Sequence, residues 1–398
     1  MDDSTLGDRI RSIRRRRGLT QRQLADRAGV SVSIVRMLEQ GERDTTGLAT
    51  LHKLASALRV RTASLSAGPD AAPPDDGDVA AWEAVRRAVG GSHDGAPDRE
   101  PSEAGVEAGC AEAVRLVLAS RFTEVQEMLP ALLRDADSLV TASGGDGPSR
   151  AARSRARQLA GYMLGQTWQL DGAADALALA MDDAAGDPAT ERAAAAWLAW
   201  ARLRGGDLDG CAGLASDWAD RSEPRLTRAS RDEIAAWGRF QILIATVAAR
   251  DNRAGEAASA LRWARAVAVA GGPDFIPAAN PWDVFGPRTV EMAAGEIALV
   301  QGNPGKALGI AGHLDGREFP VPRNWLRSRL DVAAAHAAQR EDADAVGVLA
   351  AVRDAAPEWL AQQRGARDTV AMLVGHRKRA ISREVQDLAD AVRLPLVT

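Results

Sequence analysis

The sequence predicts an all-α protein with two parts. From about residue 103 onward the chain is rich in alanine, poor in β-branched runs and interrupted only by short polar turns, which is typical of consecutive helices. Near the N-terminus, apolar residues recur every three or four positions within short segments bounded by Thr, Ser and Gly. A length of 398 residues exceeds one ordinary domain. We therefore expect a small helical N-terminal domain followed by a longer helical domain.

The two parts differ in charge. Residues 1–65 contain 13 Lys or Arg and 7 Asp or Glu, a net charge of +6, whereas the whole chain carries −4. The remainder must therefore be strongly acidic. A basic domain on an acidic body indicates that the N-terminal part alone contacts phosphate groups.

The first predicted helix covers residues 6–17, with Leu6, Ile10 and Ile13 on its buried face. It ends in four consecutive arginines, of which Arg16 and Arg17 are candidates for contact with a nucleic-acid backbone. The alternative is a solvated helix end that the helix dipole favours.

Two short helices joined by a tight turn are predicted over residues 20–41. Thr20 and Ser31 can each cap a helix through the side-chain hydroxyl, and Gly29 supplies the left-handed backbone that reverses the chain. Val35 and Leu38 anchor the second helix, which leaves its outer face free. That face consists of Val32, Ser33, Arg36 and Met37.

Residues 6–65 resemble the XRE (Cro/C1-type) helix-turn-helix domain of bacterial and phage regulators. The resemblance rests on Leu19-Thr20-Gln21, Leu24-Ala25, Gly29-Val30-Ser31 and Glu39-Gln40-Gly41, followed by a further amphipathic helix over 48–58. It implies a five-helix, lambda-repressor-like domain that binds double-stranded DNA. The residues implied to contact DNA are Arg16, Arg17, Gln21, Arg22, Ser31, Val32, Ser33, Arg36, Met37 and Arg43. A helical bundle without a DNA partner is the alternative.

Residues 66–102 read as a linker. The stretch 66–78 is rich in Pro, Asp, Gly and Ala, and residues 90–101 are similar in composition. Between them, residues 79–89 can form a short helix.

Residues 103–398 contain five predicted hairpin junctions at which a small residue follows a polar turn. These small residues are Ala176, Ala212, Ala257, Ala307 and Ala345. A small side chain there lets two antiparallel helices approach closely, and stacked hairpins of this kind form a superhelix with a concave groove. The segment resembles a tetratricopeptide (TPR)-like α-solenoid that serves in sensing or dimerisation. An irregular all-α bundle is the alternative.

The widest interval between junctions holds a Pro- and Gly-rich loop over residues 273–288. Aromatic side chains in such a loop suit ligand capture, because they offer apolar area with little entropy to lose. The candidate ligand-binding residues are Phe275, Trp282, Phe285 and Arg288. Phe285-Gly286-Pro287 also resembles a segment of actinobacterial XRE regulators with TPR-like C-terminal domains. Alternatively, the aromatic residues only fill the gap between hairpins.

No residue pattern indicates catalysis. The two cysteines and five histidines match no metal-binding or redox spacing, and neither a nucleophile elbow nor a phosphate-binding loop is present. We therefore expect no enzymatic activity, no catalytic residue, no cofactor and no metal. No apolar run has membrane-spanning length and no signal peptide is evident, which favours a cytoplasmic, nucleoid-associated protein.

Together these patterns predict a sequence-specific transcriptional regulator. We expect the N-terminal domain to bind operator DNA as a homodimer, and the body to sense a small-molecule, peptide or protein effector. Two alternatives remain: a TPR-type interaction scaffold tethered to DNA, and an antitoxin-like or phage-type repressor.

Overall fold

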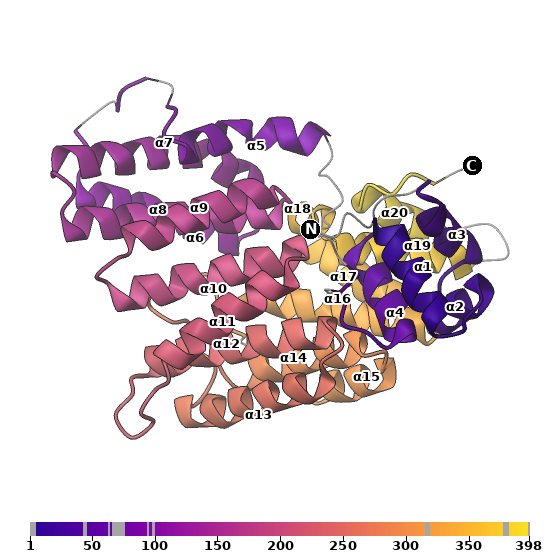
Figure 1. The fold of residues 1–398 in the computed structure, drawn as a ribbon. Helices are drawn as coiled ribbons and strands as arrows, with labels where there is room; N and C mark the ends of the chain where they lie inside the picture. The colour runs from indigo at the N-terminus through magenta and orange to yellow at the C-terminus, as the bar shows by residue number, and fades with distance from the viewer. Residues whose placement is uncertain are drawn as a thin grey trace.

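The computed structural model describes residues 5–42, 46–62, 64–65, 76–93, 95–97, 100–314, 319–376 and 382–396. Over these residues the chain is all-α, as predicted, and the one β-type pairing described is an isolated antiparallel bridge between Phe275 and Phe285. Figure 1 shows the N-terminal helices at one end of a larger array of helices.

The N-terminal domain, called the head below, is built from α1 to α4: Leu6–Arg16, Gln21–Ala28, Val32–Gln40 and Leu48–Leu58. Its core is fully buried and aliphatic, formed by Ile10, Leu24, Val35, Leu38, Leu51, Leu54, Leu58 and Leu65. The resemblance implied five helices, but the described part of the head contains four. Arg59, with a φ of 54°, ends α4, and Leu65 then closes the core from a short turn while its carbonyl accepts from the Arg9 guanidinium.

A close approach between α1 and α3 depends on Gly7. A Cβ atom at this position would lie 2.0 Å from the carbonyl oxygen of Leu38. The absent side chain therefore sets the distance at which these two helices pack.

Helix α5 (Asp76–Val89) begins inside the stretch predicted as a linker. It packs against α7, α8 and α9, and Trp82, Val85 and Val89 are buried in the same hydrophobic cluster as the residues of those helices. This segment is therefore attached to the body.

The body consists of consecutive antiparallel hairpins, α6/α7 to α16/α17, that stack side by side (Figure 1). Their bounds are Glu103–Leu118, Phe122–Ala142, Gly147–Gln166, Leu170–Asp183, Pro188–Gly205, Leu208–Arg221, Arg231–Arg250, Ala254–Gly271, Pro287–Val300, Pro304–Gly312, Pro322–Ala338 and Asp342–Ala355. The shorter helices α18 (Pro357–Ala361), α19 (Arg364–His376) and α20 (Arg383–Ala391) pack at the end of the array. The hairpins form the TPR-like array that the sequence predicted.

Each hairpin turn contains one residue with a left-handed backbone, and the fifth residue after it is buried at the contact between the two helices. The turn residues are Ser120, Trp168, Gly206, Asn252, Gly302 and Arg340; the buried ones are Val125, Ala173, Cys211, Ala257, Ala307 and Ala345. Three of the five predicted junction residues, Ala257, Ala307 and Ala345, therefore occupy this buried position. In the other two hairpins the equivalent position is Ala173 rather than Ala176, and Cys211 rather than Ala212.

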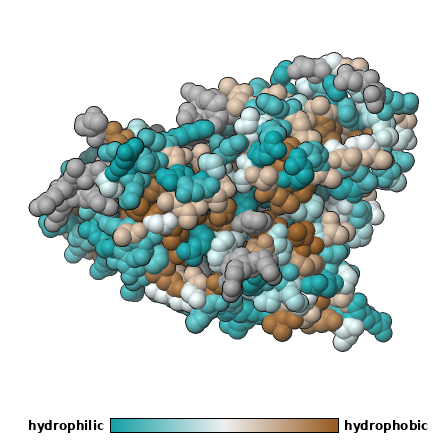
Figure 2. All heavy atoms as spheres, turned by 180° about the vertical axis from the view of Figure 1, so that it is seen from behind, coloured by the Kyte–Doolittle hydropathy of each residue, from teal (hydrophilic) through white to brown (hydrophobic). Residues whose placement is uncertain are grey.

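None of the described helices is long and apolar enough to cross a membrane. On the face drawn in Figure 2, hydrophobic residues form separate patches among hydrophilic ones.

Candidate functional site

The helix-turn-helix of the head is fixed by local hydrogen bonds. Thr20 Oγ1 accepts from the Gln23 backbone N–H at 3.1 Å, while the Gln23 side chain accepts from the Thr20 backbone N–H at 2.8 Å. Gly29 ends α2 with a φ of 61°, and Ser31 caps α3 by accepting from the Ile34 N–H. These are the capping roles that the sequence predicted, and they set the angle between the two helices.

A buried ion pair then fixes α3 to the rest of the head. Arg14 donates to both carboxylate oxygens of Glu39, at 2.6 and 2.7 Å, and also to the Leu19 carbonyl. Gln21 donates to the same carboxylate at 3.0 Å. Burial raises the pKa of Glu39, but the bonds from Arg14 and Gln21 outweigh it, so the pKa lies below its ordinary value.

The predicted DNA-contact residues lie on α1, α2, α3 and the intervening turns. Six of them are exposed: Arg16, Arg17, Arg22, Ser31, Ser33 and Arg36; Gln21, Val32 and Met37 are half-buried. Arg43 lies outside the described residues. The structure therefore places a set of exposed arginines and hydroxyl groups around α3.

The opposite side of the head, at α4, is docked on the body. Both ring nitrogens of His52 face body carbonyl oxygens: Nδ1 lies 2.6 Å from that of Arg250 and Nε2 lies 3.0 Å from that of Val300. Thr62 also donates to the Arg250 carbonyl, and the Asn252 side chain donates to the Val60 carbonyl. The contact therefore joins α4 to the ends of α12 and α14.

An ion pair adds to this contact. Arg61 Nε lies 2.6 Å from a carboxylate oxygen of Asp251, which is fully buried, and Arg61 Nη2 lies 2.5 Å from Asp209. Ser31, Ser33 and Arg36 stay exposed while the head is docked on the body.

A cavity of 2120 Å³ lies between the head and the inner helices of the body. Its inner wall carries a cluster of aromatic side chains, Tyr162, Trp197, Trp200 and Trp282, with neighbouring ring centroids 4.8 to 6.2 Å apart. On the head side it is lined by His52, Lys53 and Ser56 of α4, among others. Concave sites lined by aromatic groups with a few polar ones are typical of ligand binding.

Of the four candidate ligand residues from the loop 273–288, the structure places only Trp282 in the cavity lining. Phe285 packs on Gly238, where an added Cβ would meet its ring at 2.1 Å. The Phe275 ring is covered by the Arg231 guanidinium, 4.0 Å from its centroid. Arg288 donates to Asp274 at 3.1 Å. These three side chains are thus engaged in contacts of the loop and of its helical neighbours.

Charged residues form a network across the cavity. Arg250 pairs with Glu296 at 2.5 Å, and Arg327 lies 3.3 Å from Asp331. Burial raises the pKa of Asp331 to about 7, against the opposing effect of Arg327. Arg250 thus links the cavity to the head, since its side chain belongs to this network while its carbonyl oxygen accepts from the head.

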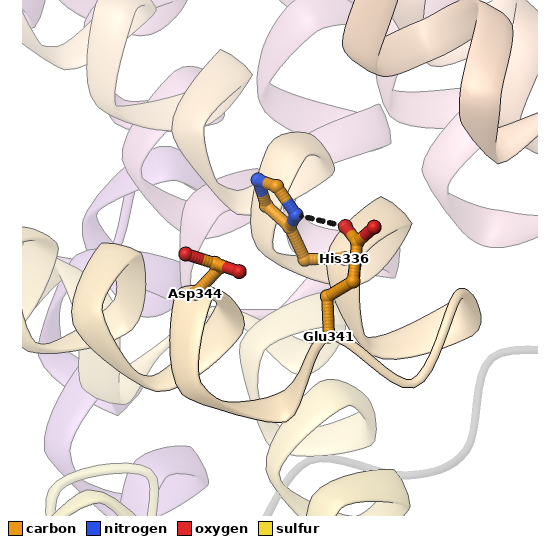
Figure 3. Close-up of side chains that lie close together, drawn as sticks. All are labelled: His336, Glu341 and Asp344. Atoms are coloured by element: carbon orange, nitrogen blue, oxygen red, sulfur yellow. Dashed lines mark hydrogen bonds and ion pairs between the residues drawn. The ribbon is translucent and has the colours of Figure 1, made fainter.

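A separate group of polar side chains lies at the turn between α16 and α17. Figure 3 shows His336, Glu341 and Asp344 around this turn, with His336 Nδ1 2.6 Å from the Glu341 carboxylate. One ligand-type atom from each residue lies within 4.8 Å of the others. Both carboxylates are exposed, and His336 already has Glu341 as its partner. The close approach of the three side chains is therefore explained by the contact between His336 and Glu341, which fixes the turn.

Several residues of the sites were not identified from the sequence. Glu39 was noted only as part of a motif, although it holds Gln21 and Arg14. The docking residues His52, Arg61 and Thr62 carry no local signal, because their partners are 148 to 248 residues away. Within the described part of the chain, the cavity residues come from nine helices spread over the body.

Comparisons with known proteins agree with this description of the head. Residues 10–65 match a family model described as "Helix-turn-helix". The HTH-type transcriptional regulator RghRB of Bacillus subtilis (strain 168), itself described as uncharacterized, is 41% identical over 64 residues. That match covers 16% of this chain and 46% of the relative, so the chain spans about half the length of the curated relative.

A solved structure also aligns with a large part of the chain. The crystal structure of the P58(IPK) TPR domain aligns over 73% of this chain and 98% of that one, with 14% identity and a TM-score of 0.18. At this score the alignment does not identify the fold of the body, which is defined by its own stacked helical hairpins.

Proposed function

Residues 10–65 match a helix-turn-helix family model, and we propose that they form an XRE-type DNA-binding domain. We further propose that the protein is a non-enzymatic transcriptional regulator that binds specific DNA sequences. The observation that carries the proposal is the exposed face of α3, which the capping residues and the Arg14–Glu39 pair hold in place. Arg36 projects from this face and reads a base edge in the major groove. Arg16, Arg17, Arg22 and Arg43 contact phosphates, and Gln21 positions the domain.

The body acts as the sensor in this proposal. The cavity is bounded on one side by α4, so an occupant touches both domains. A ligand that pairs with the cavity network changes the position of Arg250, whose carbonyl oxygen holds His52 and Thr62 of the head. Such a ligand changes the fraction of molecules with a docked head only if it binds the docked and the released state with different affinity.

The heads act in pairs. A homodimer binds two half-sites about one turn of DNA apart, and docking on the body sets the spacing of the two heads. The protein then works in the cytoplasm, on the nucleoid.

In vitro selection tests the proposal. The purified full chain is incubated with a pool of random double-stranded DNA, and bound sequences are enriched over several rounds. We expect a short two-fold motif, and we expect Arg36→Ala to lose preference at one position of each half-site. Enrichment without any shared motif would contradict sequence-specific binding.

A further inference from the structure

Resting on the proposed sensor role of the body, we propose that the cavity binds a small, flat, apolar molecule that carries one acid group, and that Arg204 of α10 pairs with that acid. The acid is a carboxylate, phosphate or sulfonate, since these share the negative charge that a guanidinium recognises.

Two nitrogens of the Arg204 guanidinium lack a hydrogen-bond partner among the residues that the structure describes. Nε and Nη2 are covered by surrounding atoms and make no hydrogen bond in the part of the chain that the structure describes. The guanidinium lies over two rings, 4.2 Å from the centroid of Trp168 and 5.1 Å from that of Trp200. The rings fix its position, and the half-buried side chain contacts the cavity.

No carboxylate of the described residues forms an ion pair with this guanidinium, although Arg204 is one of the charges that lower the pKa of Glu296. Three carboxylates of the cavity lining are each paired with a different arginine: Asp283 with Arg239, Glu296 with Arg250, and Asp331 with Arg327. The charges acting on Asp368, also in the lining, come from Arg364, Arg367 and Lys53.

Burial, and then the neighbouring cations Arg327 and Arg250, lower the pKa of Arg204 to about 9. A half-buried cation close to other cations is costly, and an anion brought into the cavity offsets that cost.

The other unsatisfied group of the lining is also a donor. Trp282 Nε1 is buried without a partner in the described residues, whereas Trp197 Nε1 donates to Asn280. Unsatisfied donors favour a ligand with acceptor atoms. The cluster of Tyr162, Trp197, Trp200 and Trp282 supplies the apolar surface on which a flat molecule stacks.

Two fluorescent probes separate the acid from the apolar part of the ligand. 8-Anilinonaphthalene-1-sulfonate carries a sulfonate, and N-phenyl-1-naphthylamine has the same ring system without it. Both are titrated into the full chain, with Arg204→Gln, Arg204→Lys and, as the matched control, Arg262→Gln. Arg262 is exposed on α13 and does not line the cavity.

We expect Arg204→Gln to weaken binding of the sulfonate probe about tenfold or more and to leave the neutral probe unchanged. Arg204→Lys should retain most of the affinity for the sulfonate probe, because it keeps the positive charge. Arg262→Gln should not change the affinity for either probe. Circular dichroism melting verifies that each variant is folded.

Equal affinity of wild type and Arg204→Gln for the sulfonate probe would overturn the proposal. So would an equal loss for both probes, because the variant would then have changed the cavity rather than the acid contact. The titrations contain no DNA, so their failure leaves sequence-specific DNA binding standing, and a failed DNA selection leaves the Arg204 site standing.

Discussion

At the scale of single residues, Glu39 connects the predicted reading face to the core of the head. Its carboxylate accepts from Arg14 on α1 and from Gln21 at the start of α2, although it belongs to α3 itself. The motif Glu39-Gln40-Gly41 was visible in the sequence, but the buried role of the carboxylate was not. The sequence shows a glutamate before Gln40 and Gly41, but the partners of its carboxylate depend on how α1, α2 and α3 pack together.

Glu39→Gln should destabilise the head by on the order of 2–4 kcal/mol at pH 7, because it leaves the buried Arg14 without its counter-charge. The folded-state pKa of Glu39 lies below the ordinary value of 4.5. Its stabilising contribution is therefore present above pH 4.5 and is lost as the pH falls through the folded-state value. Urea unfolding at pH 7 and at pH 3.5 should show the difference between wild type and variant shrinking at the lower pH.

The exposed Glu42 provides the control for that experiment. Glu42→Gln should leave the free energy of unfolding nearly unchanged at both pH values. A pH-independent loss in Glu39→Gln would mean that packing, and not charge, accounts for the effect.

Arg36→Ala should cost about 1–3 kcal/mol of binding free energy at one base pair of the selected site and little on other sequences. Arg16→Ala should instead weaken binding to all sequences. It should also lower the number of counterions released on binding by about one, which is measured from the salt dependence of the affinity. Fluorescence anisotropy with a panel of single-substitution sites at several salt concentrations measures both effects. A uniform loss for Arg36→Ala would assign Arg36 to the phosphates.

At the scale of helices, local sequence signals were sufficient to predict the helices and turns of the head, but they predicted the hairpins of the body only in part. Thr20, Gly29 and Ser31 specify the helix-turn-helix through their own backbone contacts. The hairpin turns of the body also follow a rule, but Trp168 and Arg340 adopt left-handed backbone there without the usual Gly or Asn. The position of the small residue was missed after Trp168, where α9 offers several alanines, and after Gly206, where the buried residue is Cys211 and the alanine beside it was predicted.

The contact between α1 and α3 gives a prediction at this scale. Gly7→Ala should destabilise the head by about 1–3 kcal/mol, because the new methyl group meets the Leu38 carbonyl oxygen and the two helices must move apart. Gly47→Ala is the control, since a Cβ there meets nothing within 4 Å. Calorimetric melting of both variants measures the effect. Equal stability of the two would show that the close approach does not constrain the head.

At the scale of the whole molecule, the docked head and the cavity beneath it could not be predicted. The sequence indicated two parts and their charges, and it indicated an aromatic loop, from which the structure places only Trp282 in the cavity. The remaining lining comes from helices as far apart as α8 and α19, and the head contributes one wall. Whether the loop residues bind a ligand stays a prediction.

The docking contact should make the head and body unfold together. His52→Ala removes a side chain whose two ring nitrogens face body carbonyl oxygens. We therefore expect differential scanning calorimetry to show a separate, earlier transition of the head in this variant. His313→Ala, an exposed histidine outside the contact, should melt like the wild type. A single transition in His52→Ala would mean that Arg61 and Asn252 suffice to hold the head.

We propose that the exposed face of α3 directs this protein to specific DNA sequences. Chromatin immunoprecipitation with sequencing in the native host, comparing the tagged wild type with Arg36→Ala, tests it most directly. We predict a limited number of sharp peaks that share a two-fold motif, and their loss or redistribution in the variant. Absence of enriched sites in the wild type, or identical sites in the variant, would contradict the claim.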